Sequence, residues 1–518
     1  MSRAARAGGP AVDVEELLVR VKSGTETELI DVAREVAALV EEGRLGEDDD
    51  EGLLVPALLA RLAGSGNAEV RVSVMAALRR LAGCVRGDSK ERLASIEALS
   101  SIVRSLSRDT DERREAIAVL LDLTEIPQVR QRIGRIKGCI IMLVTLRNAH
   151  ESGTNDDADK LLHILSSNPQ NVLLMAEAGY FRPLIHYLKE GSDMNKVLMA
   201  TAISKMFLSE QMKCSLGEDG AVEPLVDMFK HGNLEAKQSA LDEKAAALGI
   251  LSNLPVTDNK ITEVLVKANL LHVLISLFEA NITASLSPKR MWLLEGIAGV
   301  FIRFTTALDK KLQSLAVGYG VVPCLVKLLS EGSVDAKSKS ATSLAQLSQS
   351  SMALRKSKLP RWLCVPPSAE SYCIVHNCQC TVKSTFCLVK AGAVNPLVRI
   401  LEGEERGADG AVLEAVATLM QDEIWENGSR VIERAGGIHA LLRVAEAGEL
   451  SSQDKAIWML ERIFRLEVHR DRYGEIAQAL LIDLAQKGNP VLKPMIAATS
   501  LDHAEMLLEE DCCKAMIF

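Results

Sequence analysis

The sequence predicts an all-α solenoid, in which similar helical units stack along one axis. Only 3% of the 518 residues are aromatic whereas 48% are hydrophobic, so the core must be built largely from aliphatic side chains, as in packed helices. A glycine-centred motif also recurs along the chain, followed each time by apolar residues at helical spacing. Together these features predict stacked repeats, none of which can bury its apolar face alone.

The recurring motif consists of a glycine, any residue, an apolar residue, two variable residues, a leucine and a second apolar residue. Successive occurrences lie 41, 41, 49, 51, 72 and 44 residues apart. Most of these intervals are close to the period of about 40–47 residues that is typical of armadillo and HEAT arrays. We therefore predict an armadillo-type solenoid with a right-handed superhelix. The anchor residues of the motif are Gly138, Gly179, Gly220, Asn269, Gly320, Gly392 and Gly436.

Each anchor is predicted to lie where one helix has ended and the chain must turn. An amphipathic helix then begins at the apolar residues of the motif, often with a proline in its first turn. A further helix follows, as in AVLEAVATLM at 411–420, where Val412, Ala415 and Leu419 share one face. Glycine or polar clusters such as EGS at 331–333 separate the two helices.

Weaker copies of the pattern at 54–83 and 98–124 extend the predicted solenoid towards the N-terminus. The acidic run GEDDDEG at 46–52 is predicted to be a solvated loop. The predicted organisation is a disordered N-terminus at 1–10, a helical segment with the acidic loop at 11–53, armadillo repeats at 54–354, a Cys/His-rich insertion at 355–381, C-terminal armadillo repeats at 382–502 and a tail at 503–518.

Charge and hydropathy exclude several classes of function. The net charge of −9 provides no overall basic field for a nucleic-acid backbone. The first residues lack the apolar run of a secretory signal, and no long uncharged apolar stretch predicts a transmembrane segment. We expect a cytoplasmic protein, with nuclear location and peripheral membrane association left open. The 11 cysteines are then expected to be thiols or metal ligands, not a disulfide framework.

Several segments resemble the armadillo repeats of plant U-box proteins, and the resemblance covers most of the chain from about Leu54 onward. They include KAGAVNPLVRIL at 390–401, DGAVEPLVDMF at 219–229 and AALGILSNLPVTDNK at 246–260. The resemblance implies ubiquitin ligation, in which a U-box recruits the charged conjugating enzyme and the armadillo array holds a substrate or another protein. The family's Cys-Pro-Ile, Asp-Pro-Val and Tyr-Glu-Arg signatures do not occur, and no cysteine precedes Cys84.

We therefore expect either a relative without a U-box or a truncated product. The predicted function is a protein-interaction scaffold in plant ubiquitin-dependent signalling or in stress and defence regulation, with the partner on the concave surface of the array. The alternative is an E3 ubiquitin-protein ligase of the RING/U-box type, or the substrate-binding part of one. No phosphate-binding loop, HExxH pair or catalytic dyad indicates another enzyme, and no cofactor is required.

Asn253, in the segment ILSNLPV, is the candidate residue of the partner-binding groove. The resemblance implies this role, because many armadillo repeats use an asparagine at this place to hold a peptide backbone. The alternative is that Asn253 simply ends its helix, as asparagine often does. No comparable asparagine recurs in the following units, and the four tryptophans have no repeat spacing.

The longest interval, 72 residues between Gly320 and Gly392, contains an insertion of about thirty residues that is rich in cysteine and histidine. Zinc prefers four sulfur or imidazole ligands in a tetrahedron, and a metal could order a segment with little core of its own. The preferred set of structural zinc ligands is Cys364, Cys373, His376 and Cys380. Reduced thiols without a metal are the alternative, and no acid or base partner indicates a catalytic cysteine.

Two further cysteines are excluded from this set. Cys378 is expected to point away, because His376 and Cys380 already span three residues. Cys387 lies five residues before its anchor Gly392, as Leu174, Val264 and Val431 lie before theirs. It is therefore predicted to be a core residue of the returning repeat, separate from the cluster.

Overall fold

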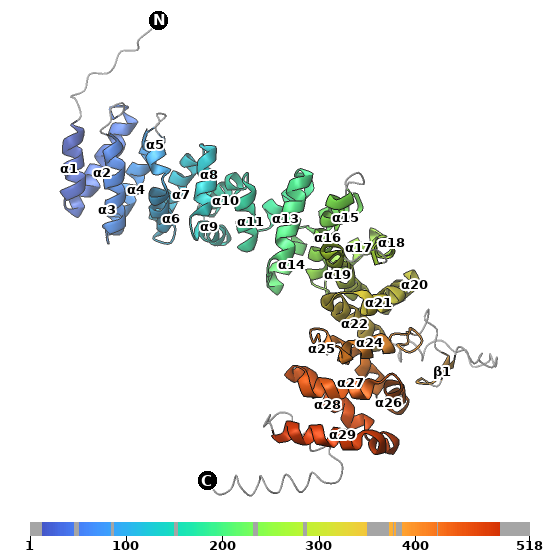
Figure 1. Ribbon diagram of the computed structural model, residues 1–518. Coiled ribbons are helices and arrows are strands. Elements are labelled where there is room, and N and C mark those ends of the chain that lie inside the picture. Colours follow the sequence, from blue (N-terminus) through green and yellow to red (C-terminus); the bar gives the residue numbers. More distant parts are fainter. Residues whose placement is uncertain are drawn as a thin grey trace, which may run out of the picture. The chain divides into compact units, whose positions relative to one another are not determined.

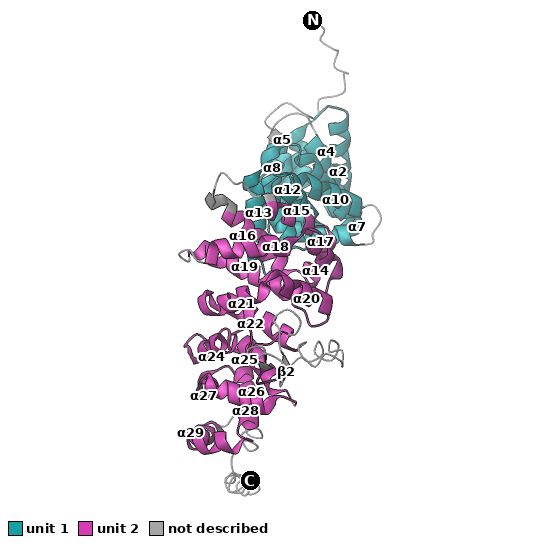
Figure 2. Cartoon of the chain, turned by 90° about the vertical axis from the view of Figure 1, so that its right-hand side faces the viewer, with its two compact units in different colours: residues 1–207 teal, residues 208–518 magenta. Residues whose placement is uncertain are grey.

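The computed structural model describes residues 13–45, 51–83, 88–149, 154–231, 237–282, 287–349, 372–376, 378–379, 386–421 and 423–486. Their regular structure is almost entirely helical, apart from one short hairpin, so the all-α prediction is confirmed. The chain divides into two compact units, residues 1–207 and 208–518 (Figure 2). The predicted N-terminal disorder, the centre of the acidic loop, most of the insertion and the C-terminal tail lie outside the described residues.

Unit 1 is a stack of short helices. In it α2 packs against α4, α4 against α7, and α7 against α10 (Figure 1). The helices α1 and α2 of the predicted helical N-terminal segment pack against α3 and α4. The helices are α1 (Val14–Ser23), α2 (Glu26–Glu41), α3 (Glu51–Gly64), α4 (Ala68–Gly83), α5 (Asp88–Leu93), α6 (Ile96–Ser105), α7 (Thr110–Leu123), α8 (Pro127–Arg135), α9 (Cys139–Asn148), α10 (Thr154–Leu165), α11 (Pro169–Glu177), α12 (Arg182–Glu190) and α13 (Asp193–Lys205).

Unit 2 repeats the same pattern. Its helices are α14 (Glu210–Glu218), α15 (Val222–His231), α16 (Lys237–Asn253), α17 (Asn259–Lys267), α18 (Leu270–Ile282), α19 (Pro288–Phe304), α20 (Lys310–Tyr319), α21 (Val321–Glu331), α22 (Val334–Gln349), α24 (Val394–Glu402), α25 (Asp409–Ala417), α26 (Trp425–Arg434), α27 (Gly437–Ala447), α28 (Leu450–Ile463) and α29 (Glu467–Gln486). A 3-10 turn, η1 (Thr418–Met420), extends α25, and β1 (Tyr372–Cys373) pairs with β2 (Cys378–Gln379) in an antiparallel hairpin.

The repeat of unit 2 consists of three helices. A first helix such as α17 or α20 is followed by a second, α18 or α21, across bends of 69° and 72°, and by a longer third helix, α19 or α22. Third helices pack on one another in the order α16, α19, α22, α25 and α28, and second helices in the order α18, α21, α24 and α27. Each repeat therefore buries its apolar face against its neighbours, as expected for a solenoid.

The seven predicted anchors all have a left-handed backbone. The φ angles of the six glycines lie between 71° and 96°, and that of Asn269 is 53°. Glycine adopts this conformation without steric strain, and asparagine is one of the few other residues that tolerate it. Among the described residues, Asn269 alone has a positive φ without being a glycine. The prediction that the chain turns at each anchor is confirmed, although before Gly392 the described residues form turns in place of a helix.

Within the described ranges, no single helix has both the length and the apolar composition needed to cross a membrane. The bent pairs α17–α18 and α20–α21 pass the same test only when each pair is taken together.

Candidate functional site

The third helices of unit 2 pack side by side, and we call the exposed side of α16, α19, α22, α25 and α28 the third-helix face. Ion pairs join neighbouring helices across it. Lys289 of α19 lies 2.6 Å from Asp242 of α16. Lys455 of α28 likewise lies 2.6 Å from a carboxylate oxygen of Glu414 in α25. The face therefore carries charges of both signs.

A tryptophan with two basic neighbours lies at the C-terminal end of this face. Trp458 of α28 is half-buried, with the ammonium of Lys455 5.9 Å and the guanidinium of Arg462 5.3 Å from its ring centroid. Such cation–π contacts hold the ring and the charges in one place. Sequence reasoning missed this group, although the i, i+3, i+7 spacing of the three residues places them on one side of a helix.

Asn253 is the last residue of α16, and its side chain is exposed. This position fits both predicted roles, since a residue at the end of a third helix can cap that helix or contact a bound chain. The groove role of Asn253 stays a prediction.

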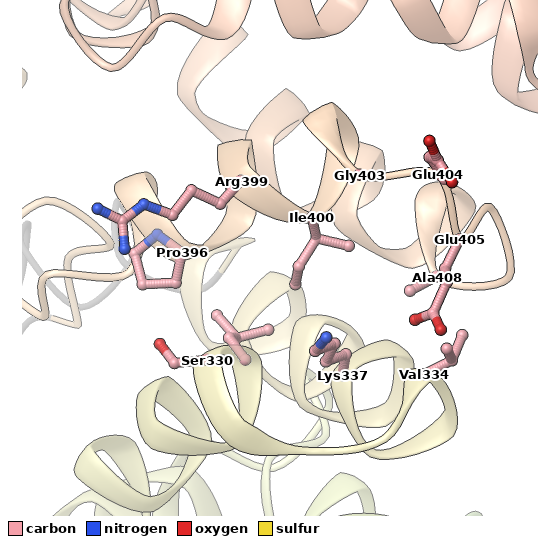
Figure 3. A pocket seen from close by; sticks show the side chains of 11 residues that line it. Ser330, Val334, Lys337, Pro396, Arg399, Ile400, Gly403, Glu404, Glu405 and Ala408 are labelled. Carbon is pink, nitrogen blue, oxygen red and sulfur yellow. The ribbon is translucent and has the colours of Figure 1, made fainter.

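A cleft of about 340 Å³ separates two successive repeats of unit 2, where the turn from α21 to α22 faces the turn from α24 to α25. Figure 3 shows Pro396 and Arg399 towards one end, and Glu404 and Glu405 towards the other, with Lys337 between them. Its volume is at the small end of the range of ligand pockets, about 300–1,000 Å³. Because its charged residues are of both signs, the cleft does not indicate a particular cofactor.

Three potential metal ligands meet at the hairpin of the insertion. Cys373, His376 and Cys387 are all buried, and their ligand atoms lie within 4.8 Å of one another. The sulfur of Cys373 is 3.4 Å from Nδ1 of His376 and 3.6 Å from the sulfur of Cys387. Neither cysteine is disulfide-bonded. Strand β1 contains Cys373, and His376 lies in the turn that follows β1.

The grouping corrects one prediction. Cys387 is buried, with 1% of its surface exposed, as expected of a core residue, but its separation from the cluster is wrong. The sulfur contact with Cys373 joins residues that are 14 positions apart. The repeat register placed Cys387 correctly against the core and could not show that the hairpin folds back over it.

The structure does not describe two of the four predicted ligands. Cys364 and Cys380 lie outside the described residues, so their role stays a prediction. The backbone of Cys378 lies on β2, paired with Cys373 on β1.

Electrostatics at His376 favour a cation. Burial alone would lower the pKa of this imidazole, but the contacts with Cys373 and Cys387 outweigh burial and raise its pKa to about 9.

Comparison with known proteins gives matches over much of the chain. It is 27% identical to U-box domain-containing protein 43 of Arabidopsis thaliana over 448 residues. This alignment covers 81% of this chain and 50% of that protein. It is 26% identical over 365 residues to U-box domain-containing protein 44 of the same plant, covering 65% and 44%. Its relatives are plant U-box domain-containing proteins. U-box domain-containing protein 24 of Oryza sativa subsp. japonica is 28% identical over 307 residues, covering 51% of this chain and 35% of that protein.

The predicted resemblance to plant U-box proteins is thereby confirmed. The chain spans about half the length of the U-box domain-containing proteins that it matches first, 44% and 50%. No family model matches the chain. Among solved structures, an engineered protein superposes over 87% of this chain with 19% identity and a TM-score of 0.41.

Proposed function

We propose that this chain is an armadillo-type protein-interaction scaffold that acts in a plant ubiquitin-dependent process and holds a protein partner on the third-helix face. The observation that carries the proposal is the unbroken packing of α16, α19, α22, α25 and α28. This packing places equivalent surfaces of successive repeats side by side, as extended partners require. The names of the relatives support the connection with ubiquitin.

The chemistry of the face suits a partner that is itself a polypeptide. Its ion pairs Lys289–Asp242 and Lys455–Glu414 each join two neighbouring third helices and offer both hydrogen-bond donors and acceptors. Trp458 adds a flat apolar surface beside two positive charges. Tryptophan and arginine are enriched among the residues that contribute most to protein interfaces.

A comparison of interacting proteins tests this proposal. Tagged wild-type chain, the double variant Trp458→Ala/Arg462→Ala and the control Lys267→Ala would be purified from plant cells, and bound proteins quantified by mass spectrometry. Lys267 lies on the first helix α17 and pairs only at the surface with Glu263, so its loss should leave binding unchanged. We expect a set of partners that the double variant loses and the control retains. Identical partner sets for all three chains would contradict a binding role for this face.

A second assay distinguishes the proposed scaffold from the alternative, a ubiquitin ligase. Purified chain is mixed with a ubiquitin-charged conjugating enzyme and free lysine, and the rate of ubiquitin discharge is measured. A scaffold should leave this rate at its unassisted value. Acceleration without any added ligase would show that the chain is itself a ligase.

A further inference from the structure

We propose that Cys373, His376 and Cys387 bind a structural zinc ion that fastens the inserted segment to the repeat that follows it. Cysteine sulfur and histidine nitrogen are the ligands of structural zinc sites. All three residues are buried, with exposed fractions of 1%, 6% and 1%.

Two of the three distances within the cluster agree with zinc coordination, and the third is no longer than 4.8 Å. In a tetrahedron with Zn–S bonds of about 2.3 Å and Zn–N bonds of about 2.0–2.1 Å, two sulfurs lie about 3.8 Å apart and a sulfur and a nitrogen about 3.6 Å apart. The observed separations are 3.6 Å between the sulfurs of Cys373 and Cys387 and 3.4 Å between Cys373 and Nδ1 of His376. A disulfide would instead need the sulfurs about 2.0 Å apart.

The position of the cluster explains what the metal would do. Cys387 begins the turn that leads to the left-handed anchor Gly392 and then to α24, and Ala391 donates a backbone hydrogen bond to its carbonyl. From residue 386 to α24, the described chain forms turns, where other repeats of unit 2 have a first helix. The hairpin β1–β2 lies against this turn through Cys373. Zinc would hold the hairpin where a first helix otherwise packs.

Among the described residues, few apolar side chains are available to hold the hairpin against the turn. Of the described hairpin residues, Val375 is buried whereas Ile374 is 46% exposed. Phe386 and Leu388 are buried beside Cys387. A metal bond between hairpin and turn adds ordering energy that so small an apolar contact area does not supply.

Metal analysis of the full chain tests the proposal. The protein is purified under reducing conditions without chelator, and zinc is measured by mass spectrometry against protein concentration. We expect about one zinc per chain for the wild type, since a structural site holds a single ion. Cys373→Ser and Cys387→Ser should each lower this content to near zero. The matched control is Cys324→Ser, because Cys324 of α21 is equally a buried cysteine but lies outside the cluster, and it should retain the metal.

Two further measurements keep the test valid if a serine variant folds poorly. His376→Cys replaces one zinc ligand by another and should retain zinc, whereas His376→Ala should lose it. Cobalt(II) bound in place of zinc should show the visible absorption of a tetrahedral thiolate site, which His376→Cys changes.

The outcome that overturns the proposal is a wild-type chain without stoichiometric metal, both as purified and after addition of zinc under reducing conditions. Retention of zinc by both serine variants would overturn it equally. Structural zinc is almost always four-coordinate, so the same analysis of Cys364→Ser and Cys380→Ser checks the two ligands predicted from the sequence alone.

Discussion

The contact between α16 and α19 depends on two glycines, and this gives a sharp prediction for Gly299→Ala. A Cβ atom at Gly299 would lie 2.5 Å from the Cβ of Ser252, and one at Gly296 would lie 2.8 Å from the Cβ of Leu248. Non-bonded carbon atoms normally approach to about 3.5–4.0 Å. Because both neighbouring atoms are fixed to the α16 backbone, no rotamer change can relieve the clash.

Two opposing effects set the change in the free energy of unfolding that Gly299→Ala causes. Alanine is more favourable than glycine inside a helix by about 0.8–1 kcal/mol. Overpacking of a close contact costs about 1–3 kcal/mol. The added carbon of Gly299→Ala would lie about 1 Å closer to Ser252 than a normal contact allows, and only a movement of the whole of α19 could relieve this. We therefore expect the cost of overpacking to be near the upper value. The net destabilisation should be about 1–2 kcal/mol.

Hydrogen exchange measured by mass spectrometry is the suitable assay, because unfolding of a repeat array need not be two-state. Peptides from α16 and α19 should exchange about tenfold faster in Gly299→Ala than in the wild type, as a loss of about 1.4 kcal/mol implies. The control is Gly318→Ala in α20, where nothing lies within 4 Å of the added carbon. That variant should be stabilised by about 0.4–1 kcal/mol.

The double variant Ser252→Gly/Gly299→Ala separates the clash from other effects. Removing the Ser252 side chain makes room for the new methyl group, so the double variant should be less destabilised than the sum of the two single variants. If Gly299→Ala exchanges no faster than the wild type in α16 and α19, the inferred close packing of these helices is refuted.

Three further predictions concern other parts of the array. Gly320→Ala should destabilise the junction of α20 and α21 by about 1–2 kcal/mol, because φ is 96° there, and thermal unfolding will measure the loss. Glu112→Ala should destabilise unit 1 by about 1–3 kcal/mol, because it removes the carboxylate oxygen 2.7 Å from Nε of the buried Arg71, whereas the contact of Arg71 with Asp109 remains. Hydrogen exchange in α4 and α7 measures this loss, and Glu125→Ala, at an exposed residue, is the control. Burial lowers the pKa of His469, so the unfolded chain binds a proton at higher pH than the folded one. Stability near α29 should therefore fall as the pH drops below about 6.5, and His469→Gln should abolish this pH dependence in exchange measurements.

The repeat could be predicted from the amino-acid sequence. Aliphatic residues at helical spacing and a glycine at each anchor predicted where the chain turns, and Asn269 was recognised as an anchor without being a glycine. These predictions succeed because they depend on neighbours within one repeat. Left-handed turns and amphipathic helices are local properties, and a local pattern is sufficient to encode them.

Contacts between distant segments were decided only by the tertiary structure. The register of Cys387 indicated a core residue, yet its sulfur lies against Cys373, because the hairpin folds back onto the turn before α24. Nothing in the spacing of Gly296 and Gly299 indicated that α16 approaches them closely. The third-helix face likewise arises only when helices about 40 to 70 residues apart pack together. Such contacts depend on how the repeats stack. The distance between two stacked helices is set by the side chains of both helices, which the pattern within one repeat does not reveal.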